Sequence, residues 1–352
     1  MVRVQDVVEF LEQHAPLCHQ AAYDNAGLQV GDVQQPVTGV LTCLDVTEQV
    51  LKEAQQTDCQ LIVSHHPVLF KPLKKLTGCS AAERLLAYAV RHNTAIYAAH
   101  TNLDSVLDGV SGALAETLGL KEVKVLSSTS STTKKLTMWV ACTHAVAIQQ
   151  ALRRSGAVTT ILGPGENPPL QNTMLQSQSK ALCCIEAVLP LSDEKRVLAA
   201  LANTHPCPSA AYTLQSVHAV NSQVGLGAIG HLPESLSIET FLQHVRQALQ
   251  TRCIRHSCGD MQRSVRRIAV CGGAGSFLAG QALAQGADVL LTADLKYHDF
   301  TDASEKMLLV DVGHYESEIG AAELLRRLIS NNFAKIAVAT ARTAENPVRY
   351  FF

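Results

Sequence analysis

The feature that most constrains the fold is a run of apolar residues that fits a strand covered on both faces. Cys59–Val63 is almost continuously apolar, as strands between two layers of helices are. A helical stretch, residues 47–56, precedes it, and a shorter strand-like run, Val40–Val46, comes before that helix. Repeated strand–helix units of this kind predict a parallel sheet with helices on both faces.

The alternation continues towards residue 126 and then stops. A helix at 81–92, a strand at 95–99 and a helix at 110–118 extend the pattern. The polar stretch 127–133 consists only of Ser and Thr and predicts a break in the chain. We therefore place the end of the first part of the domain near residue 126.

The following segment, 127–221, has a different order of elements. It is expected to contain strands 135–142, 182–188 and 211–220, helices 145–154 and 193–202, and a loop at 163–169. This order is typical of a small ferredoxin-like α+β unit. The earlier alternation returns with helices 238–250 and 318–329 and strands 267–271, 287–292 and 306–312. We predict a discontinuous α/β domain, 1–126 and 222–352, interrupted by an inserted α+β domain at 127–221.

Composition narrows the class of protein. The 47% hydrophobic and 17% charged residues suit a globular chain and exclude general disorder. A net charge of −2, with no run of basic residues longer than pairs such as Arg266-Arg267, argues against nucleic-acid binding. Neither a signal peptide nor a run of 18 apolar residues is present, and the 11 Cys cannot all pair. We expect a cytoplasmic protein without a membrane segment, with most Cys buried as small apolar residues.

Unusual polar clusters follow three of the predicted strands. Ser64-His65-His66-Pro67 follows the first buried strand, and His100–Asp104 follows the strand at 95–99. The third cluster, Asp311–Glu318, contains His314 and follows the apolar run Met307–Val310. Because ligands bind at the carboxyl edge of a parallel sheet, we expect the three clusters to meet at that edge.

The clustered residues have the chemistry of a metal site. Imidazole and carboxylate ligands suit Zn, Mn, Fe or Co, and His314 and Glu318 share one face if a helix begins at His314. Successive side chains diverge in an extended backbone, which Pro67 favours at His66. The adjacent His65 and His66 therefore suggest two metal ions, which would clamp a hydroxide and polarise a substrate oxygen.

Simpler explanations exist for each residue. A single His at a strand end is commonly a hydrogen-bonded polar residue, and an acidic residue such as Glu318 in a first helical turn complements the helix dipole. Gly272–Ser276 could hold a phosphate at a helix N-terminus, or it could be only a tight strand-to-helix turn.

The sequence also resembles a known family. The segments Tyr23–Gly31, Ser64–Pro67, Ala99–Asp104, Asp294–His298, Gly313–Glu318 and Asn346–Phe351 look like the signatures of the Nif-three-like family. Its members are widely labelled GTP cyclohydrolase I type 2 homologs. The resemblance covers residues 1–126 and about 222–352, while 127–221 matches only the position and length of the insert in longer members.

The resemblance implies two divalent metal ions and a ligand set. The ligands implied are His65, His66, Asp104, His314 and Glu318. It also implies a toroidal homohexamer whose metal sites face an internal cavity. A settled reaction is not implied, and the family's other name refers to binding of a transcription coactivator subunit.

Two functions remain open from the sequence. The chain can be a metal-dependent hydrolase of a small nucleotide-like molecule, with His100 or His298 moving protons or merely orienting a ligand. It can instead be a metal-stabilised oligomeric scaffold that binds a regulatory protein, since its charge permits protein partners. The ligands alone do not name a substrate.

Overall fold

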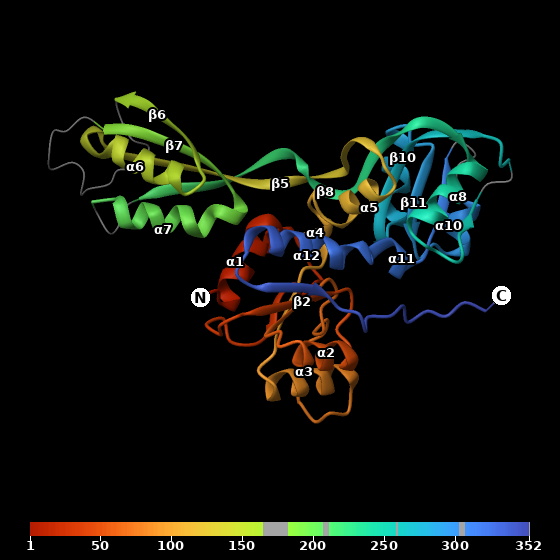
Figure 1. The fold of residues 1–352 in the computed structure, drawn as a ribbon. Helices are drawn as coiled ribbons and strands as arrows, with labels where there is room; N and C mark the ends of the chain where they lie inside the picture. The colour runs from red at the N-terminus through yellow and green to blue at the C-terminus, as the bar shows by residue number, and fades with distance from the viewer. Residues whose placement is uncertain (165–181, 207–210, 258–259, 303–306, 352) are drawn as a thin grey trace. The chain divides into compact units, whose positions relative to one another are not determined.

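The structure is a computed structural model that describes residues 1–164, 182–206, 211–257, 260–302 and 307–351 (Figure 1). The predicted loop at 163–169 and strand at 306–312 lie partly outside the described residues. Contacts between Cα atoms divide the chain into two compact units. Unit 1 consists of Met1–Thr129 and Ser222–Phe352, and unit 2 of Ser130–Asn221.

A five-stranded sheet forms the first half of unit 1. Its strand order is β1-β4-β3-β2-β13, with β1 Gly27–Val30, β2 Gly39–Cys43, β3 Leu61–Ser64, β4 Ala95–Ala98 and β13 Ala337–Thr340. The four strands other than β1 are parallel, whereas β1 pairs with β4 in the antiparallel direction. The predicted strands are therefore parallel, as expected, and the antiparallel edge strand β1 was not predicted.

Helices cover both faces of this sheet, as the apolar strand run predicts. The helices are α1 Val4–His14, α2 Glu48–Gln56, α3 Ala81–Arg91 and α12 Gly320–Asn332. α1 and α12 pack on one face, and α2 and α3 on the other (Figure 1). Leu61, Ile62 and Val63 of β3 are fully buried, and each such side chain contributes about 1.5–3 kcal/mol to folding. Hydroxyl caps fix two helix starts, because Thr47 accepts from Val50 N and Ser80 from Glu83 N.

A second, mixed sheet forms the other half of unit 1. Its strands are the C-terminal part of β8 Tyr212–Ser237, then β10 Ser264–Ala274, β11 Val289–Ala293, β12 Leu308–Asp311 and β9 Arg255–His256. β10, β11 and β12 are parallel, and β8 and β9 are antiparallel to their neighbours. One face packs on α5 Val110–Thr117 and α8 Ile238–Ala248. The other packs on α9 Ala279–Ala284 and α10 Tyr297–Thr301.

Unit 2 has its own core of strands and helices. The elements are the C-terminal part of β5 Lys121–Ala141, α6 Cys142–Arg154, β6 Val158–Pro164, β7 Leu182–Pro190, α7 Glu194–Thr204 and the start of β8. β7 pairs with β5 on one side and β6 on the other, both antiparallel. Apolar residues of α6 and α7 pack on the strands.

The Ser/Thr stretch 127–133 does not interrupt the secondary structure, because β5 continues through it. The boundary between the two units nevertheless falls inside this stretch, between Thr129 and Ser130. β-Branched Thr fits an extended backbone, which explains why a polar composition did not end the strand. The strand β6 was not predicted.

The described cysteines include one pair that the sequence did not reveal. Cys142 at the start of α6 and Cys183 in β7 form a disulfide within unit 2. Cys43, Cys59, Cys184 and Cys271 are buried thiols, whereas Cys79 is exposed. No helix in the described part of the chain is both long and apolar enough to cross a membrane.

Candidate metal centre

The predicted residues of the first two clusters follow neighbouring strands of the five-stranded sheet. His65 and His66 come directly after β3, and their backbone N–H groups donate to Cys43 O and Leu44 O beside the end of β2. His100 follows β4 and precedes α4 Thr101–Asp104, a single turn that ends in Asp104. The parallel pairing of β3 with β4 therefore places both clusters at one carboxyl edge.

The third cluster comes from the other sheet of unit 1. His314 and Glu318 are the first and last residues of α11 His314–Glu318, which follows β12. At this i, i+4 spacing, His314 Nε2 lies 2.9 Å from Glu318 Oε2. The expectation that all three clusters share one sheet edge is therefore wrong. The clusters meet because strand ends of two different sheets lie together.

The Nδ1 atom of each imidazole in the centre is held by an oxygen acceptor. The pairs are His65 with Ala99 O (2.7 Å), His66 with Asp45 (2.8 Å), His100 with Asp24 (2.7 Å) and His314 with Asp294 (2.7 Å). An acceptor at Nδ1 fixes the ring orientation and leaves Nε2 for another partner. This is the arrangement in which proteins present histidine to a metal ion.

The two oxygens of Glu318 face different sets of donor atoms. Oε1 lies 3.8 Å from His65 Nε2, and His65 Nε2 lies 3.7 Å from Asp104 Oδ1. Oε2 lies 3.0 Å from His66 Nε2 and 2.9 Å from His314 Nε2. The carboxylate of Glu318 thus lies between two groups of nitrogen and oxygen atoms.

Two ligand-type atoms on the Oε1 side have no hydrogen-bond partner. His65 Nε2 and Asp104 Oδ1 are both buried, and neither finds a donor or acceptor among the described residues. Leaving a buried polar atom unpaired costs about 1–3 kcal/mol, so such atoms in a native protein need an explanation. A cation between them would satisfy both, and the donor set therefore fits a metal ion.

On the Oε2 side, the geometry requires two charged imidazoles when no ion is bound. His66 and His314 each have a carboxylate at both ring nitrogens, so both nitrogens must donate. Burial opposes the charge on His66, but Asp45 and Glu318 outweigh it and raise its pKa to about 10. The hydrogen bond to Glu318 raises the pKa of His314 to about 9.

Carboxylates outnumber the imidazoles in the centre. Burial raises the pKa of Asp104 to about 7, and burial also disfavours charge on Glu318. The hydrogen bonds from His314 and His66 and the charge of the nearby His65 nevertheless hold the pKa of Glu318 below its usual value. The acidic residues that contact the four imidazoles are Asp24, Asp45, Asp104, Asp294 and Glu318. This excess of negative charge favours bound cations.

Of the two proton-transfer candidates, His100 lies in the centre and His298 does not. Donor atoms of His65, His66 and His100 lie within 4.8 Å of one another, and a second such group consists of His66, His314 and Glu318. Burial lowers the pKa of His100, which keeps the ring neutral near pH 7. The ring of His298 contacts that of Tyr297, at 5.4 Å between centroids. Within the described residues, His298 belongs to neither donor group.

The glycine-rich segment 272–276 has a packing role beside the centre. The Gly273 N–H donates to Ser317 Oγ at 3.0 Å, so this group is already paired within the protein. Gly273 has φ +59°, and a Cβ there would lie 2.3 Å from Glu318 Oε1. Close approach of β10 to α11 therefore explains this glycine, which favours the turn over the phosphate-binding alternative.

The orienting carboxylates were the residues that sequence reasoning missed. Asp24 and Asp294 belong to motifs that carry the family resemblance, but no pattern in the sequence assigned them an orienting role. Asp45 was not among the candidate site residues. Asp45 comes two residues after β2, at the same sheet edge as His65 and His66. The rule that ligands gather at strand ends could have found Asp45.

The whole chain matches one protein family. The model of the Duf34/NIF3 (NGG1p interacting factor 3) family matches residues 2–347. A Halalkalibacterium halodurans protein named "GTP cyclohydrolase 1 type 2 homolog" is 32% identical over 98% of this chain and 98% of its own length. A Bacillus subtilis protein of the same name is 33% identical over 94% of this chain and 92% of its own.

A solved structure has the same fold. The crystal structure of a Bacillus cereus protein related to NIF3 superposes with a TM-score of 0.81 at 31% identity. The match covers 100% of this chain and 99% of that one. The family match, the relatives and the shared fold agree over nearly the full length. The chain therefore belongs to the Duf34/NIF3 family.

Proposed function

We propose that this chain binds two divalent metal ions on opposite sides of the Glu318 carboxylate. His65 Nε2, Asp104 and Glu318 Oε1 would hold one ion, and His66 Nε2, His314 Nε2 and Glu318 Oε2 the other. The unpaired His65 Nε2 and Asp104 Oδ1 support the first position. The imidazoles held at Nδ1 by Asp45 and Asp294 support the second, since these rings are already oriented as ligands.

The ligand atoms favour a transition metal over a hard cation. Three imidazole nitrogens and two carboxylates suit Zn, Mn, Fe or Co, whereas Mg and Ca prefer oxygen ligands. We therefore propose that both ions come from this group of transition metals.

We infer that the centre is a metal-dependent hydrolase of a small nucleotide-like molecule. When bound, two such ions supply Lewis-acid charge and make water acidic near neutral pH. His100 is suited to accept a proton at Nε2, because burial keeps it neutral and Asp24 stabilises the charge that it would gain. The name of the Halalkalibacterium halodurans and Bacillus subtilis relatives supports a nucleotide-like substrate.

Elemental analysis combined with a hydrolysis screen tests this proposal. The purified protein should contain about two transition-metal ions per chain and hydrolyse a nucleotide or phosphoester. Chelation should remove both ions and abolish the turnover. His65→Ala should remove the ion beside His65 and abolish the turnover. Turnover that survives chelation, or full activity of His65→Ala, would refute the hydrolase.

His100→Ala separates proton transfer from metal binding. If His100 moves a proton, the variant keeps the metal content of the wild type and loses turnover at every pH. Loss of metal in this variant would instead identify His100 as a ligand. His298→Ala is the matched control, and we expect it to retain both metal and activity because its ring lies against Tyr297.

A second candidate is a metal-stabilised oligomeric scaffold for a regulatory, transcription-related protein. The description of the family as an interacting factor supports it. We propose a toroidal homohexamer in the cytoplasm, without direct nucleic-acid contact, for either function. Light scattering should give six chains if the ring forms. A pull-down that recovers one partner with both wild type and His65→Ala, without turnover, would favour the scaffold.

We also infer that unit 2 is a ferredoxin-like module inserted into an α/β domain. The order β5-α6-β6-β7-α7-β8, with β7 between β5 and β6, supports this assignment.

A further inference from the structure

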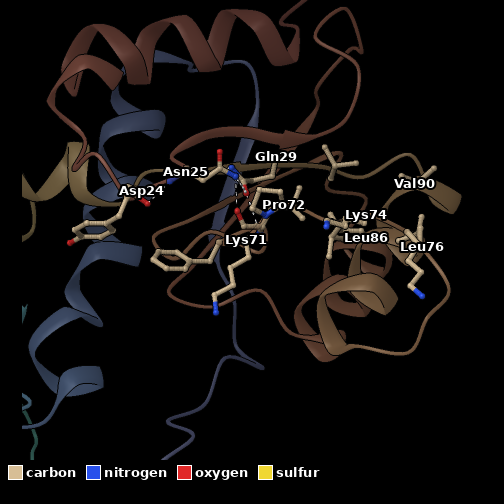
Figure 2. A pocket seen from close by; sticks show the side chains of 15 residues that line it. Asp24, Asn25, Gln29, Lys71, Pro72, Lys74, Leu76, Leu86 and Val90 are labelled. Carbon is tan, nitrogen blue, oxygen red and sulfur yellow. Dashed lines mark hydrogen bonds between the residues drawn. The ribbon is translucent and has the colours of Figure 1, made fainter.

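A pocket of about 790 Å³ lies beside the metal centre in unit 1. β1, the segment between β3 and α3, and α3 line it (Figure 2). Figure 2 shows Asp24 towards one end and Lys74 and Val90 towards the other, with Asn25 and Gln29 between them. Its volume is in the range of small-molecule sites, about 300–1,000 Å³.

Two residues join this pocket to the metal centre. Asp24 lines the pocket, and its Oδ1 accepts the hydrogen bond from His100 Nδ1 at 2.7 Å. Phe70 also lines the pocket, and its ring lies edge-on to that of His100 with centroids 6.3 Å apart. A ligand in the pocket would therefore lie next to the imidazole that faces His65 and His66.

The pocket carries unneutralised positive charge. Lys71, Lys74 and Lys75 line it and are exposed, and none of them forms an ion pair with another described residue. The carboxylate on its wall, Asp24, is fully buried and bonded to His100 and Thr101. An anionic group in the pocket would therefore find ammonium groups in the lining that have no ion-pair partner among the described residues.

Two aromatic rings also line the pocket. Tyr23 is 71% exposed and Phe70 46% exposed, and their ring centroids are 6.3 Å apart. Exposed aromatic rings in a concave site are typical surfaces for a planar ligand.

Amide side chains fix the lysine-bearing segment in place. Asn25 Nδ2 donates to Leu69 O at 2.6 Å, and Leu69 N donates to Gln29 Oε1 at 3.1 Å. Both amides come from the chain around β1, so they tie the start of this segment to the sheet. The bonds hold Phe70 and Lys71 at the pocket and leave the lysines available to a ligand.

We propose that this pocket recognises the substrate of the metal centre, and that the substrate carries both a planar ring and a phosphate. Tyr23 and Phe70 would contact the ring, and Lys71, Lys74 and Lys75 the phosphate. This inference rests on the proposed function, because it takes the neighbouring centre as the place of reaction. It adds the residues that select the substrate and the two chemical groups that they select.

Calorimetric binding to the full-length protein tests the proposal with GMP, guanosine and inorganic phosphate as probes. The double variant Lys74→Ala/Lys75→Ala should bind GMP about tenfold more weakly and guanosine as well as the wild type does. Phe70→Ala should weaken the binding of GMP and of guanosine by about tenfold and leave the binding of phosphate unchanged. Lys335→Ala is the control, since this exposed lysine precedes β13 at the opposite edge of the sheet.

The possible outcomes distinguish failure of the pocket assignment from failure of the hydrolase proposal. All titrations are done on metal-loaded and on chelated protein, so binding is measured without turnover. Equal GMP affinity in wild type and both pocket variants, or no GMP binding at millimolar concentration, overturns the pocket assignment. Retained, lysine-dependent GMP binding with no hydrolysis would support the pocket and refute the hydrolase.

Discussion

His65 Nε2 and Asp104 Oδ1 lie 3.7 Å apart, and both atoms are buried without a hydrogen-bond partner among the described residues. A direct hydrogen bond would need a shorter separation, and leaving both buried atoms unpaired is costly. A cation coordinated by both atoms removes that cost. The unfavourable pair is therefore the feature that most strongly indicates a metal ion.

Replacing Asp104 by Asn should remove one ion without unfolding the protein. The amide has the same shape but lacks the charge that would hold the ion beside His65, so we expect about one ion per chain instead of about two. Mass spectrometry of the intact native protein measures the stoichiometry. The exposed Asp108, replaced by Asn in the same way, should keep both ions. Equal metal content in the two variants would argue against Asp104 as a ligand.

Asp45→Asn tests an orienting carboxylate. Asp45 Oδ1 holds His66 Nδ1 at 2.8 Å, and its loss should free the ring and weaken the ion beside His66 by about 10–100-fold. A competition titration with a chromophoric chelator gives this affinity. The ion beside His65 should bind as before, because Ala99 O orients that ring. Unchanged affinity for both ions would mean that Asp45 does not orient a ligand.

Metal binding should release protons at pH 7. The pKa of His66 is raised to about 10 and that of His314 to about 9 in the metal-free centre, so both rings carry a proton at Nε2 that an ion must displace. Calorimetry in buffers of different ionisation enthalpy should therefore report release of at least two protons per loaded chain, because the carboxyl of Asp104, with a pKa of about 7, must also be deprotonated to bind an ion. A heat of binding that is the same in every buffer would exclude this exchange.

The same raised pKa values give the metal-free protein a defined pH dependence. Because the folded-state pKa values exceed the unfolded value, the stabilisation is fully present below about pH 6.5 and is lost as pH rises through 9 to 10. Thermal unfolding of chelated protein should show this loss, and His314→Gln should reduce it. A melting temperature that rises over this interval would contradict the assignment.

Gly273→Ala should disturb the centre through packing alone. Its Cβ would lie 2.3 Å from Glu318 Oε1, and φ of +59° is unfavourable for Ala, so we expect loss of metal and a destabilisation of more than about 1 kcal/mol. Gly280→Ala is the matched control in α9, where a Cβ meets no atom within 4 Å. That change should stabilise the protein by up to about 1 kcal/mol. Denaturant unfolding and metal analysis distinguish the two.

Local signals in the sequence identified much of the first sheet. The apolar run at β3, the helices around it and the polar residues after β3 and β4 follow from periodicity and strand-end rules. The direction of β1 and the separation into two sheets do not, because pairing partners distant in the chain leave no local pattern. The strand through residues 127–133 was not predicted, because a stretch of only Ser and Thr is typical of a linker.

The candidate site was only partly accessible from the sequence. The pattern and the family resemblance together named His65, His66, Asp104, His314 and Glu318, and the structure places these residues in one cluster. The carboxylates that orient the rings were not assigned, because an Asp 20 or more residues away has no spacing rule. His298 seemed equivalent to His100 in sequence, and only its position in α10 separates them.

Anomalous diffraction from crystals of the full chain, recorded at the absorption edge of the bound metal, would locate the ions themselves. We predict two peaks per chain, one on each side of the Glu318 carboxylate, with His65 and Asp104 at one and His66 and His314 at the other. Both peaks should disappear or weaken in Glu318→Gln. A single peak away from Glu318, or no peak in protein purified without chelator, would contradict the dinuclear centre.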